Sequence, residues 1–180
     1  MPNIKIIGGN YKGKIINFPN IKKLRPTLSI ARERLFNWLM YDIKGSKCLD
    51  AFSGSGSLGF EAYSRGAKTI TFIEISKKIF INLKKNALSF KNNKFTIINE
   101  NAISFLKKKK DNFNIIFLDP PFKKKYINKL INTPILHQCL YRNGLLYTES
   151  NSAAIISTNL WKKIKFKKQN NIFYGLYMKI

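Results

Sequence analysis

After Gly45 the chain alternates between short apolar runs and longer segments whose apolar residues have helical spacing. The apolar runs predict strands at 47–52, 69–73, 95–98, 114–118 and 144–149. The segments between them predict helices at 58–65, 76–90, 102–109 and 125–140. Strands that alternate with helices form βαβ units and a mainly parallel sheet. Such a sheet carries its ligand-binding loops at the carboxyl ends of its strands.

Further segments flank this alternating pattern at both ends. Residues 4–7 and 14–18 predict an N-terminal β-hairpin, with glycines and Asn10 between them. A helix is expected to begin at Ser29, as its N-cap, and to run to about Ile43. Its expected apolar face consists of Ile30, Leu35, Trp38, Leu39 and Ile43. The last two segments, 161–168 and 172–180, predict a second hairpin that turns near Gln169, Asn170 and Asn171.

The predicted fold is therefore α/β, with a seven-stranded mixed sheet. Its N-terminal extension consists of the first β-hairpin and the helix that follows. A length of 180 residues favours one domain. We expect 1–180 to form that domain, with 1–44 as the extension and 45–180 as the core.

The chain is strongly basic, with 33 Lys and Arg residues, 9 Asp and Glu residues and a formal net charge of +24. Such a charge favours a polyanionic partner, and RNA and DNA are the obvious ones. However, 28 of the basic residues are Lys, and Ile, Lys, Asn, Phe and Tyr supply 96 of the 180 residues. An AT-rich gene would produce the same bias, so both explanations of the charge stay open.

Several protein classes are disfavoured by what the sequence lacks. It has no run of about 18 apolar residues, and its first residues lack the apolar core of a signal peptide. We therefore expect a cytoplasmic protein without a membrane segment. Cys48 and Cys139 match no metal-binding spacing and are expected to be reduced thiols. His137 is expected to have a structural or surface role, and no metal site is predicted.

A glycine-rich loop follows the first predicted core strand, in the segment Asp50 to Gly59. Gly54 and Gly56 allow a tight turn that approaches a ligand closely, and amides at the start of the next helix can hold an anion. Glu74 ends the following strand, where its carboxylate can accept hydrogen bonds from both ribose hydroxyls. This pattern fits NAD as well as S-adenosylmethionine, and a purely structural turn is a third reading.

The tetrapeptide Asp119-Pro120-Pro121-Phe122 follows the apolar strand 114–118 and favours methyl transfer to an amine. The lone pair of an aromatic exocyclic amine is delocalised, and two acceptors on its hydrogens favour the tetrahedral geometry in which it attacks. The Asp119 side chain and the Pro120 carbonyl can supply these acceptors. The two prolines stiffen the loop, and Phe122 offers a flat face for a base. A nicotinamide enzyme has no evident use for this motif.

These motifs, taken together over nearly the whole chain, resemble the bacterial 16S ribosomal RNA guanine-N2 methyltransferases of the small one-domain type. The resemblance lies in IIGGNYKGK, in LRPT followed by RERLFNWL, in DAFSGSGSLGFEAYSRGA, in FIE and in LDPPF. It implies a Rossmann-like class I methyltransferase fold with S-adenosylmethionine as the methyl donor. It also implies a guanine amino group of 16S ribosomal RNA as the acceptor, in an assembling small subunit.

The resemblance also assigns roles to individual residues. Asp50 and the loop Phe52, Ser53, Gly54, Ser55 and Gly56 would contact the methionine part of the cofactor. Glu74 would hold the ribose, while Asn101 and Ala102 would meet the adenine. Asp119, Pro120, Pro121 and Phe122 would hold the guanine. Arg25 and Thr27 would lie near the site, with Arg32 and Arg34 as RNA contacts or as part of a solvated helix face.

The sequence departs from the family pattern at three positions. Phe52 and Ser53 replace smaller residues of the loop, and Asn101 replaces a common Asp. We expect the Asn101 amide oxygen to accept a hydrogen bond from the adenine amino group. A DNA adenine-N6 methyltransferase is the second reading, although 180 residues leave little room for a target-recognition domain. A non-catalytic RNA-binding protein is the third.

Overall fold

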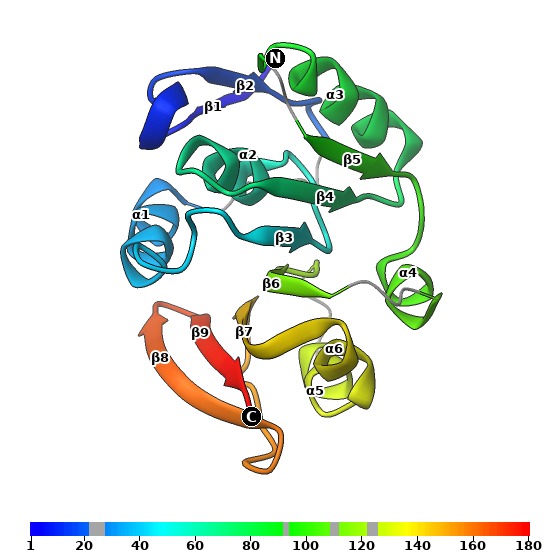
Figure 1. The fold of residues 1–180 in the computed structure, drawn as a ribbon. Coiled ribbons are helices and arrows are strands. Elements are labelled where there is room, and N and C mark those ends of the chain that lie inside the picture. Colours follow the sequence, from blue (N-terminus) through cyan, green and yellow to red (C-terminus); the bar gives the residue numbers. More distant parts are fainter. Residues whose placement is uncertain (22–27, 92–93, 109–111, 122–125) are drawn as a thin grey trace.

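The computed structural model describes the chain except for residues 22–27, 92–93, 109–111 and 122–125. Its centre is a seven-stranded sheet in the order β5-β4-β3-β6-β7-β9-β8 (Figure 1). The strands are β3 (Lys47–Asp50), β4 (Thr69–Ile73), β5 (Phe95–Ile98), β6 (Phe113–Leu118), β7 (Leu140–Ser150), β8 (Trp161–Gln169) and β9 (Ile172–Lys179). Strands β3 to β7 are parallel, and β9 lies antiparallel between β7 and β8. The predicted seven-stranded mixed sheet is confirmed.

Helices cover both faces of this sheet and bury two apolar clusters. The helices are α1 (Ser29–Trp38), α2 (Ser57–Ser64), α3 (Lys77–Ala87), α4 (Ala102–Lys108), α5 (Tyr126–Ile131) and α6 (Pro134–Gln138). Residues of α1, α2 and α3 share one buried cluster with the sheet, and residues of α4, α5 and α6 share the other. Helix α3 shows why: Ile79, Leu83 and Ala87 recur every four residues and are all buried.

The order of the strands reverses at β3, which pairs with β4 on one side and with β6 on the other. In such an open parallel sheet, the loops at this switch point separate and leave a crevice at the carboxyl ends of the strands. Asp50, the last residue of β3, pairs in register with Phe72 of β4 and with Phe117 of β6. The loops that follow β3, β4 and β6 therefore begin side by side.

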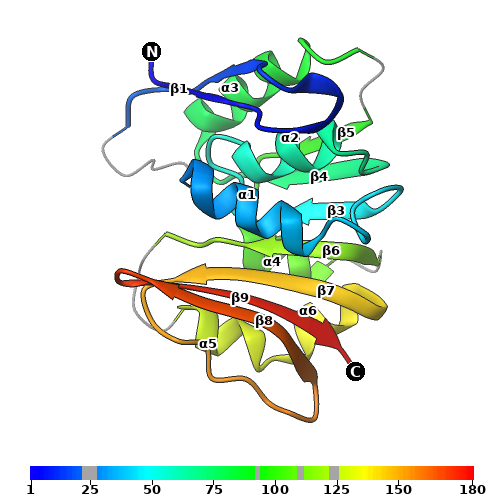
Figure 2. The ribbon, with the colours of Figure 1, turned by 90° about the vertical axis from the view of Figure 1, so that its left-hand side faces the viewer.

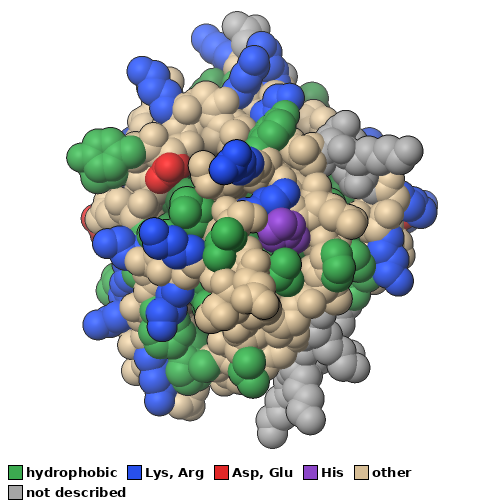
Figure 3. Space-filling model, turned by 60° about the horizontal axis from the view of Figure 1, so that its bottom comes forward, with side chains coloured by type: hydrophobic (Ala, Val, Ile, Leu, Met, Phe, Trp, Pro, Cys, Tyr) green, Lys and Arg blue, Asp and Glu red, His purple; other side chains and the backbone are tan. Residues whose placement is uncertain are grey.

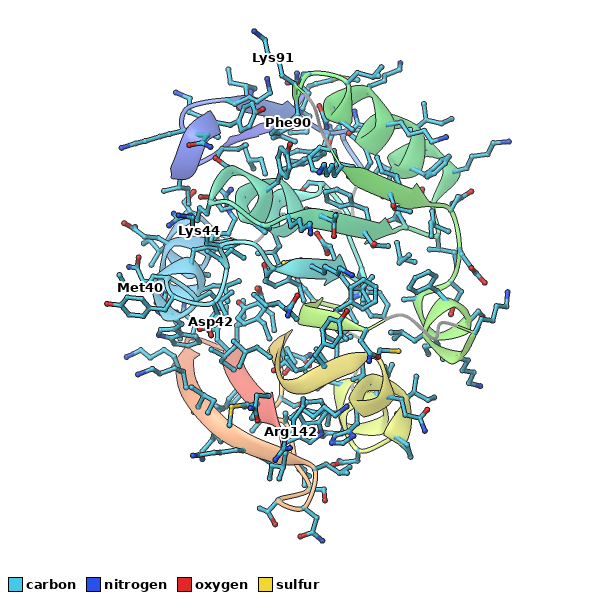
Figure 4. The ribbon with its side chains drawn as sticks, in the orientation of Figure 1. Met40, Asp42, Lys44, Phe90, Lys91 and Arg142 are labelled. Atoms are coloured by element: carbon cyan, nitrogen blue, oxygen red, sulfur yellow. The ribbon has the colours of Figure 1, made fainter. Side chains whose placement is uncertain are left out.

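The N-terminal hairpin packs on α2 and on the end of α3. Its strands β1 (Asn3–Lys5) and β2 (Ile15–Asn17) are antiparallel, and a short 3-10 turn, η1 (Gly9–Tyr11), lies between them. The Tyr11 and Phe90 ring centres are 4.8 Å apart, and the Tyr11 hydroxyl donates to the Lys91 carbonyl at 3.2 Å. Figure 4 labels Phe90 and Lys91 beside this hairpin. The predicted hairpin is confirmed, and side chains on both partners hold it in place.

Two predicted helices differ from those observed. The segment predicted as one helix at 125–140 is interrupted, because Pro134 starts α6 with Thr133 as its N-cap. Proline lacks the amide hydrogen that a continuous helix needs, but it is well suited to a first turn. Helix α1 ends at Trp38 rather than near Ile43, and its N-cap is Leu28 rather than Ser29.

Smaller differences concern single positions. Ile30, predicted on the apolar face of α1, is 62% exposed. Strand β7 starts at Leu140, whereas the predicted strand was 144–149. The register of β6 and β7 is irregular between the Phe113–Leu140 pair and the Ile115–Leu145 pair. In the described part of the chain, no helix combines the length and the apolar character needed to cross a membrane. The division into a 1–44 extension and a 45–180 core stays a prediction.

Candidate active site

The glycine-rich loop after β3 is shaped by positive φ angles at Gly54 (51°) and Gly56 (79°). A Cβ on Gly56 would lie 2.5 Å from the Phe60 ring, so both the backbone conformation and the space require glycine. The Ser53 hydroxyl donates to the carbonyls of Asp50 (2.8 Å) and Ile73 (3.1 Å). Ser53, which departs from the family pattern, therefore ties the loop to the ends of β3 and β4.

The Asp50 carboxylate links the two ends of the glycine-rich segment by a hydrogen bond to α2. It is 2% exposed, and its Oδ2 accepts from the Gly59 amide in the first turn of α2 at 3.1 Å. Burial, together with the smaller effects of the Asp119 and Glu74 charges, raises the pKa of Asp50 to about 7, against the effect of the Gly59 hydrogen bond, which lowers it. Asp50 is therefore within electrostatic reach of the carboxylates of Asp119 and Glu74.

Glu74 connects the loop after β4 with the glycine-rich loop. Its Oε2 accepts from the Gly54 amide at 3.0 Å, and its Oε1 accepts from the Ser76 amide at 2.7 Å. A carboxylate oxygen can accept two hydrogen bonds, so each oxygen keeps a lone pair for a ligand hydroxyl. The two amides fix the orientation of the carboxylate at the edge of the crevice.

The loop after β5 differs from expectation in the use of Asn101. Its Oδ1 accepts from the amides of Ile103 (2.9 Å) and Ser104 (3.2 Å) and caps α4. The oxygen that we expected to accept from an adenine amino group is therefore used within the protein. Ala102, the first residue of α4, is buried.

The Asp119-Pro120-Pro121 segment begins directly after β6. The Ala51 amide donates to the Phe117 carbonyl at 3.1 Å, so the start of the glycine-rich loop is hydrogen-bonded to the end of β6. Asp119 is half-buried, Pro120 is buried and Pro121 is exposed. Phe122 lies outside the described residues. The two loops that the sequence singled out thus meet at the switch point of the sheet.

Sequence reasoning missed a fourth acidic residue at this edge, Glu149. It lies near the end of β7 and is 4% exposed, and the Tyr147 hydroxyl donates to its Oε2 at 3.4 Å. Burial raises the pKa of Tyr147 well above its usual value, and the charges of Glu149 and Asp119 raise it further. The available signal was that Glu149 is the last residue of the predicted strand 144–149.

Acidic residues are thus concentrated in one place in a basic protein. Four of the nine lie at or just beyond the carboxyl ends of the adjacent strands β4, β3, β6 and β7, namely Glu74, Asp50, Asp119 and Glu149. Among the described residues, neither Asp50 nor Glu74 has a basic side chain within salt-bridge distance. The reactive edge, as we call the carboxyl ends of these four strands, therefore favours a cationic ligand.

The four residues predicted to lie near RNA have different outcomes. Arg25 and Thr27 lie outside the described residues. Arg32 is 1% exposed, its Nη2 donates to the Lys5 carbonyl at 3.0 Å, and its Nη1 lies 3.5 Å from Glu61 Oε2. The RNA-contact prediction and the solvated-face alternative are both wrong for Arg32, because it is a buried link between the hairpin, α1 and α2.

Arg34 lies near the reactive edge on the α1 side of the sheet. Its guanidinium is 5.4 Å from the centre of the Tyr174 ring, and its Nη2 donates to Gln169 Oε1 at 2.6 Å. Tyr174 pairs in register with Glu149. Arg34 therefore connects α1 with the tip of the last hairpin, one strand away from Glu149.

Comparisons with known proteins place this geometry in a family. A family described as conserved hypothetical protein 95 matches residues 4–178. Ribosomal RNA small subunit methyltransferase D of Buchnera aphidicola subsp. Baizongia pistaciae is 43% identical, over 99% of this chain and 93% of the relative. The chain belongs to this family. Methyltransferase D of Escherichia coli K12 is 38% identical, over 98% of this chain and 90% of the relative.

Solved structures agree with this membership of the methyltransferase D family. The yhhF protein of Escherichia coli, described as a methyltransferase, superposes with a TM-score of 0.89 at 37% identity, over 99% of this chain and 98% of that one. SMU.776, a more distant methyltransferase structure complexed with SAH, has a TM-score of 0.62 at 16% identity, over 84% of this chain and 50% of that one. The second likeness concerns the fold alone. The Rossmann-like methyltransferase fold and the family resemblance are both confirmed.

Proposed function

We propose that this chain transfers a methyl group from S-adenosylmethionine to the exocyclic N2 amine of a guanine in 16S ribosomal RNA. The observation that carries the proposal is the meeting of two loops, in a chain of this family. The glycine-rich loop leaves β3, the Asp119-Pro120-Pro121 loop leaves β6, and the two strands are hydrogen-bonded neighbours. The cytoplasm, where small subunits assemble, would be its place of action.

The residues fit the proposed cofactor. A sulfonium and an ammonium group are cations, and Glu74, together with Asp50 when it is ionised, would supply negative charge beside the loop. The methionine carboxylate is an anion, and the first turn of α2 offers amides that suit it. Phe52 to Gly56 would surround this part, Glu74 would bind the ribose, and the 101–102 segment would meet the adenine.

The guanine would be held by the loop after β6. The Asp119 carboxylate would accept one hydrogen of the N2 amine and the Pro120 carbonyl the other, which favours the tetrahedral nitrogen needed for attack. Pro120 is buried, which would restrict the movement of its carbonyl before the substrate arrives. Phe122 would stack on the base, which reaches the loop unpaired or flipped out of a helix.

When bound, S-adenosylmethionine supplies an electrophilic methyl group on its sulfonium. The nitrogen–carbon bond would form as the sulfur–carbon bond breaks, which leaves a neutral thioether on the donor. The methylated nitrogen would then lose its proton to the Asp119 carboxylate or to water. The protein contributes mainly alignment and electrostatics: Asp119 and Pro120 aim the amine, while the glycine-rich loop and Glu74 hold the donor. Neither acceptor has to remove a proton before attack.

The test is methylation of defined acceptors by the purified protein with labelled S-adenosylmethionine. The acceptors are undermethylated small subunits, naked 16S ribosomal RNA and duplex DNA. We expect label in RNA, found by mass spectrometry as N2-methylguanosine, and greater yield on the particle if an assembling subunit is the substrate. Label only in DNA adenine would favour the DNA reading. Cofactor binding without label in any acceptor would contradict the proposal.

A further inference from the structure

We propose that the β8–β9 hairpin is the surface on which the RNA next to the target base docks. The inference rests on the proposed function and adds the location of the substrate's flanking strand. In the space-filling view that brings the lower side of the molecule forward, Lys and Arg side chains alternate with hydrophobic ones along the left flank (Figure 3). Strand β8 lies on that flank in Figure 1.

Strand β8 has an exposure pattern that packing does not explain. All seven residues from 162 to 168 are exposed, although side chains of a strand alternate between two faces. Five of them are lysines, and the other two are Ile164 (37% exposed) and Phe166 (44% exposed). Both faces of this strand are therefore open to solvent and carry positive charge.

Two aromatic rings on this hairpin each have a lysine ammonium group nearby. The ring centres of Phe166 and Phe173 are 6.1 Å apart, on neighbouring strands. Lys163 Nζ lies 5.8 Å from the centre of the Phe166 ring, and Lys168 Nζ lies 5.3 Å from that of Phe173. Rings for base stacking beside cations for phosphates are the combination that binds single-stranded nucleic acid.

The hairpin turns at the reactive edge of the sheet. Phe173 pairs with Ser150, the last residue of β7, and Lys168 pairs with Phe173. Figure 2 shows the tip of the hairpin on the same side as the arrowheads of β3, β6 and β7. Neighbouring strands are about 4.8 Å apart, so three steps from β6 to β8 span roughly 14 Å. A short run of flanking nucleotides, rather than a single one, can cover that distance.

Lysines also protect exposed edge strands from pairing with another molecule, and β8 is the edge of its sheet. Edge protection accounts for charge, but it does not account for an exposed phenylalanine beside that charge. Nor does it account for the contact between the tip and α1, where Arg34 donates to Gln169 at 2.6 Å. We therefore assign the hairpin to RNA, and the experiment includes edge protection as an outcome.

The test compares two triple variants of the full chain. The first replaces Lys165, Lys167 and Lys168 by Gln, and the control replaces Lys78, Lys84 and Lys85 of α3 by Gln. The control lysines are also exposed, and Lys84 also lies over a phenylalanine ring, that of Phe80, at 4.6 Å. RNA affinity is measured against salt concentration by fluorescence anisotropy, and the mass of the free protein by light scattering.

We expect the hairpin variant to lose tenfold or more in RNA affinity, with a flatter salt dependence. Loss of three phosphate contacts reduces the log–log salt slope by about two. The control should retain affinity within about threefold, and its methylation of RNA should be unchanged. Equal effects in both variants would overturn the proposal. So would a hairpin variant that forms dimers or larger species while binding RNA normally, since that result identifies edge protection.

A Phe166→Ala variant tests the stacking part separately. We expect a loss of affinity of roughly fivefold or more at every salt concentration, because stacking on a ring does not release counterions. An unchanged affinity would remove Phe166 from the surface. If the unmodified protein methylates no acceptor and these variants still bind RNA more weakly, the docking surface is supported and the proposed reaction is wrong. If the unmodified protein methylates RNA and the variants bind RNA normally, the proposed reaction is supported and the docking surface is wrong.

Discussion

Buried acidic side chains in this fold have two kinds of partner: Glu61 is paired with arginine side chains, whereas Asp50 and Glu74 accept hydrogen bonds from backbone amides. Glu61 of α2 is fully buried, and its carboxylate accepts from the amides of Ile7 (2.8 Å) and Gly8 (2.9 Å). Arg65 Nε lies 2.8 Å and Arg32 Nη1 3.5 Å from the same carboxylate. This acid is part of the structure that fastens the N-terminal hairpin to the core.

The acids at the reactive edge receive different partners. Asp50 accepts from the Gly59 amide, and Glu74 accepts from the amides of Gly54 and Ser76. Their nearest charged neighbours include other carboxylates, which raise the pKa of Asp50 beyond the effect of burial. A buried charge with a structural role is paired with an opposite charge of the protein, whereas a charge that binds a cationic ligand is paired by that ligand. The comparison predicts which substitutions affect stability and which affect activity.

Glu61→Ala should have the largest effect, a loss of about 3–5 kcal/mol in the free energy of unfolding. It leaves the buried Arg32 guanidinium without its counter-charge and two hairpin amides without their acceptor. Urea unfolding measures the change. The matched control is Glu100→Ala, because Glu100 pairs with Lys108 at 2.6 Å near the surface and should contribute less than about 1 kcal/mol. Similar losses for the two variants would contradict the structural role of Glu61.

Asp119→Ala should raise the barrier to methyl transfer by about 2–4 kcal/mol, by analogy with the loss of one preorganised hydrogen-bonding group. Stability and cofactor affinity should change little, because Asp119 is half-buried and its proposed role is toward the amine. Single-turnover kinetics and calorimetry with S-adenosylmethionine separate the two quantities. Asp119→Asn keeps one acceptor oxygen and should lose less. A variant without Asp119 that turns over normally would refute its role.

Asp50 makes the comparison depend on pH. Its pKa is about 7 in the folded protein against 3.8 ordinarily, so the folded chain keeps a proton that the unfolded chain loses as pH rises from about 4 to 7. This residue therefore lowers stability as pH rises through that window, by at most about 1.4 kcal/mol per pH unit, and contributes no slope above it. Binding of a cation favours the ionised form, so cofactor affinity should increase over the upper part of the same window.

Asp50→Asn cannot titrate, and it should remove both pH dependences. Urea unfolding and calorimetry between pH 4 and pH 8 measure them in the variant and in the natural chain. The Asn side chain can still accept the Gly59 hydrogen bond, so the loop should keep its conformation. Identical pH profiles for the two proteins would show that the Asp50 carboxylate does not sense the cofactor's charge.

Local sequence patterns predicted most of the fold and the meeting of the two loops. Strand β4 was predicted with its observed bounds, because an apolar run between polar residues and a turn is a local signal. The burial of Arg32 was not predictable in this way, since its partners Lys5 and Glu61 come from elements distant in sequence. The same holds for Glu149, which comes to the strand next to Asp119 only because β7 pairs with β6, with Thr148 opposite Leu118. Contacts across the sheet are decided by topology, and a linear pattern contains little of it.

The two arginines of α1, Arg32 and Arg34, allow a structural charge to be compared with a surface charge on one helix, and Arg34 is expected to have the smallest effect on stability. Arg34 is half-buried and donates a hydrogen bond to the side chain of Gln169, so Arg34→Ala should cost only about 1 kcal/mol of stability. It should nevertheless weaken RNA binding, because it removes a cation at the tip of the β8–β9 hairpin. Arg32→Ala, two residues earlier, should instead destabilise the protein and leave the RNA affinity of the folded fraction intact. Urea unfolding measures the stability of both variants, and fluorescence anisotropy measures their RNA affinity. Weaker RNA binding in Arg32→Ala with normal binding in Arg34→Ala would place the RNA on the other side of α1.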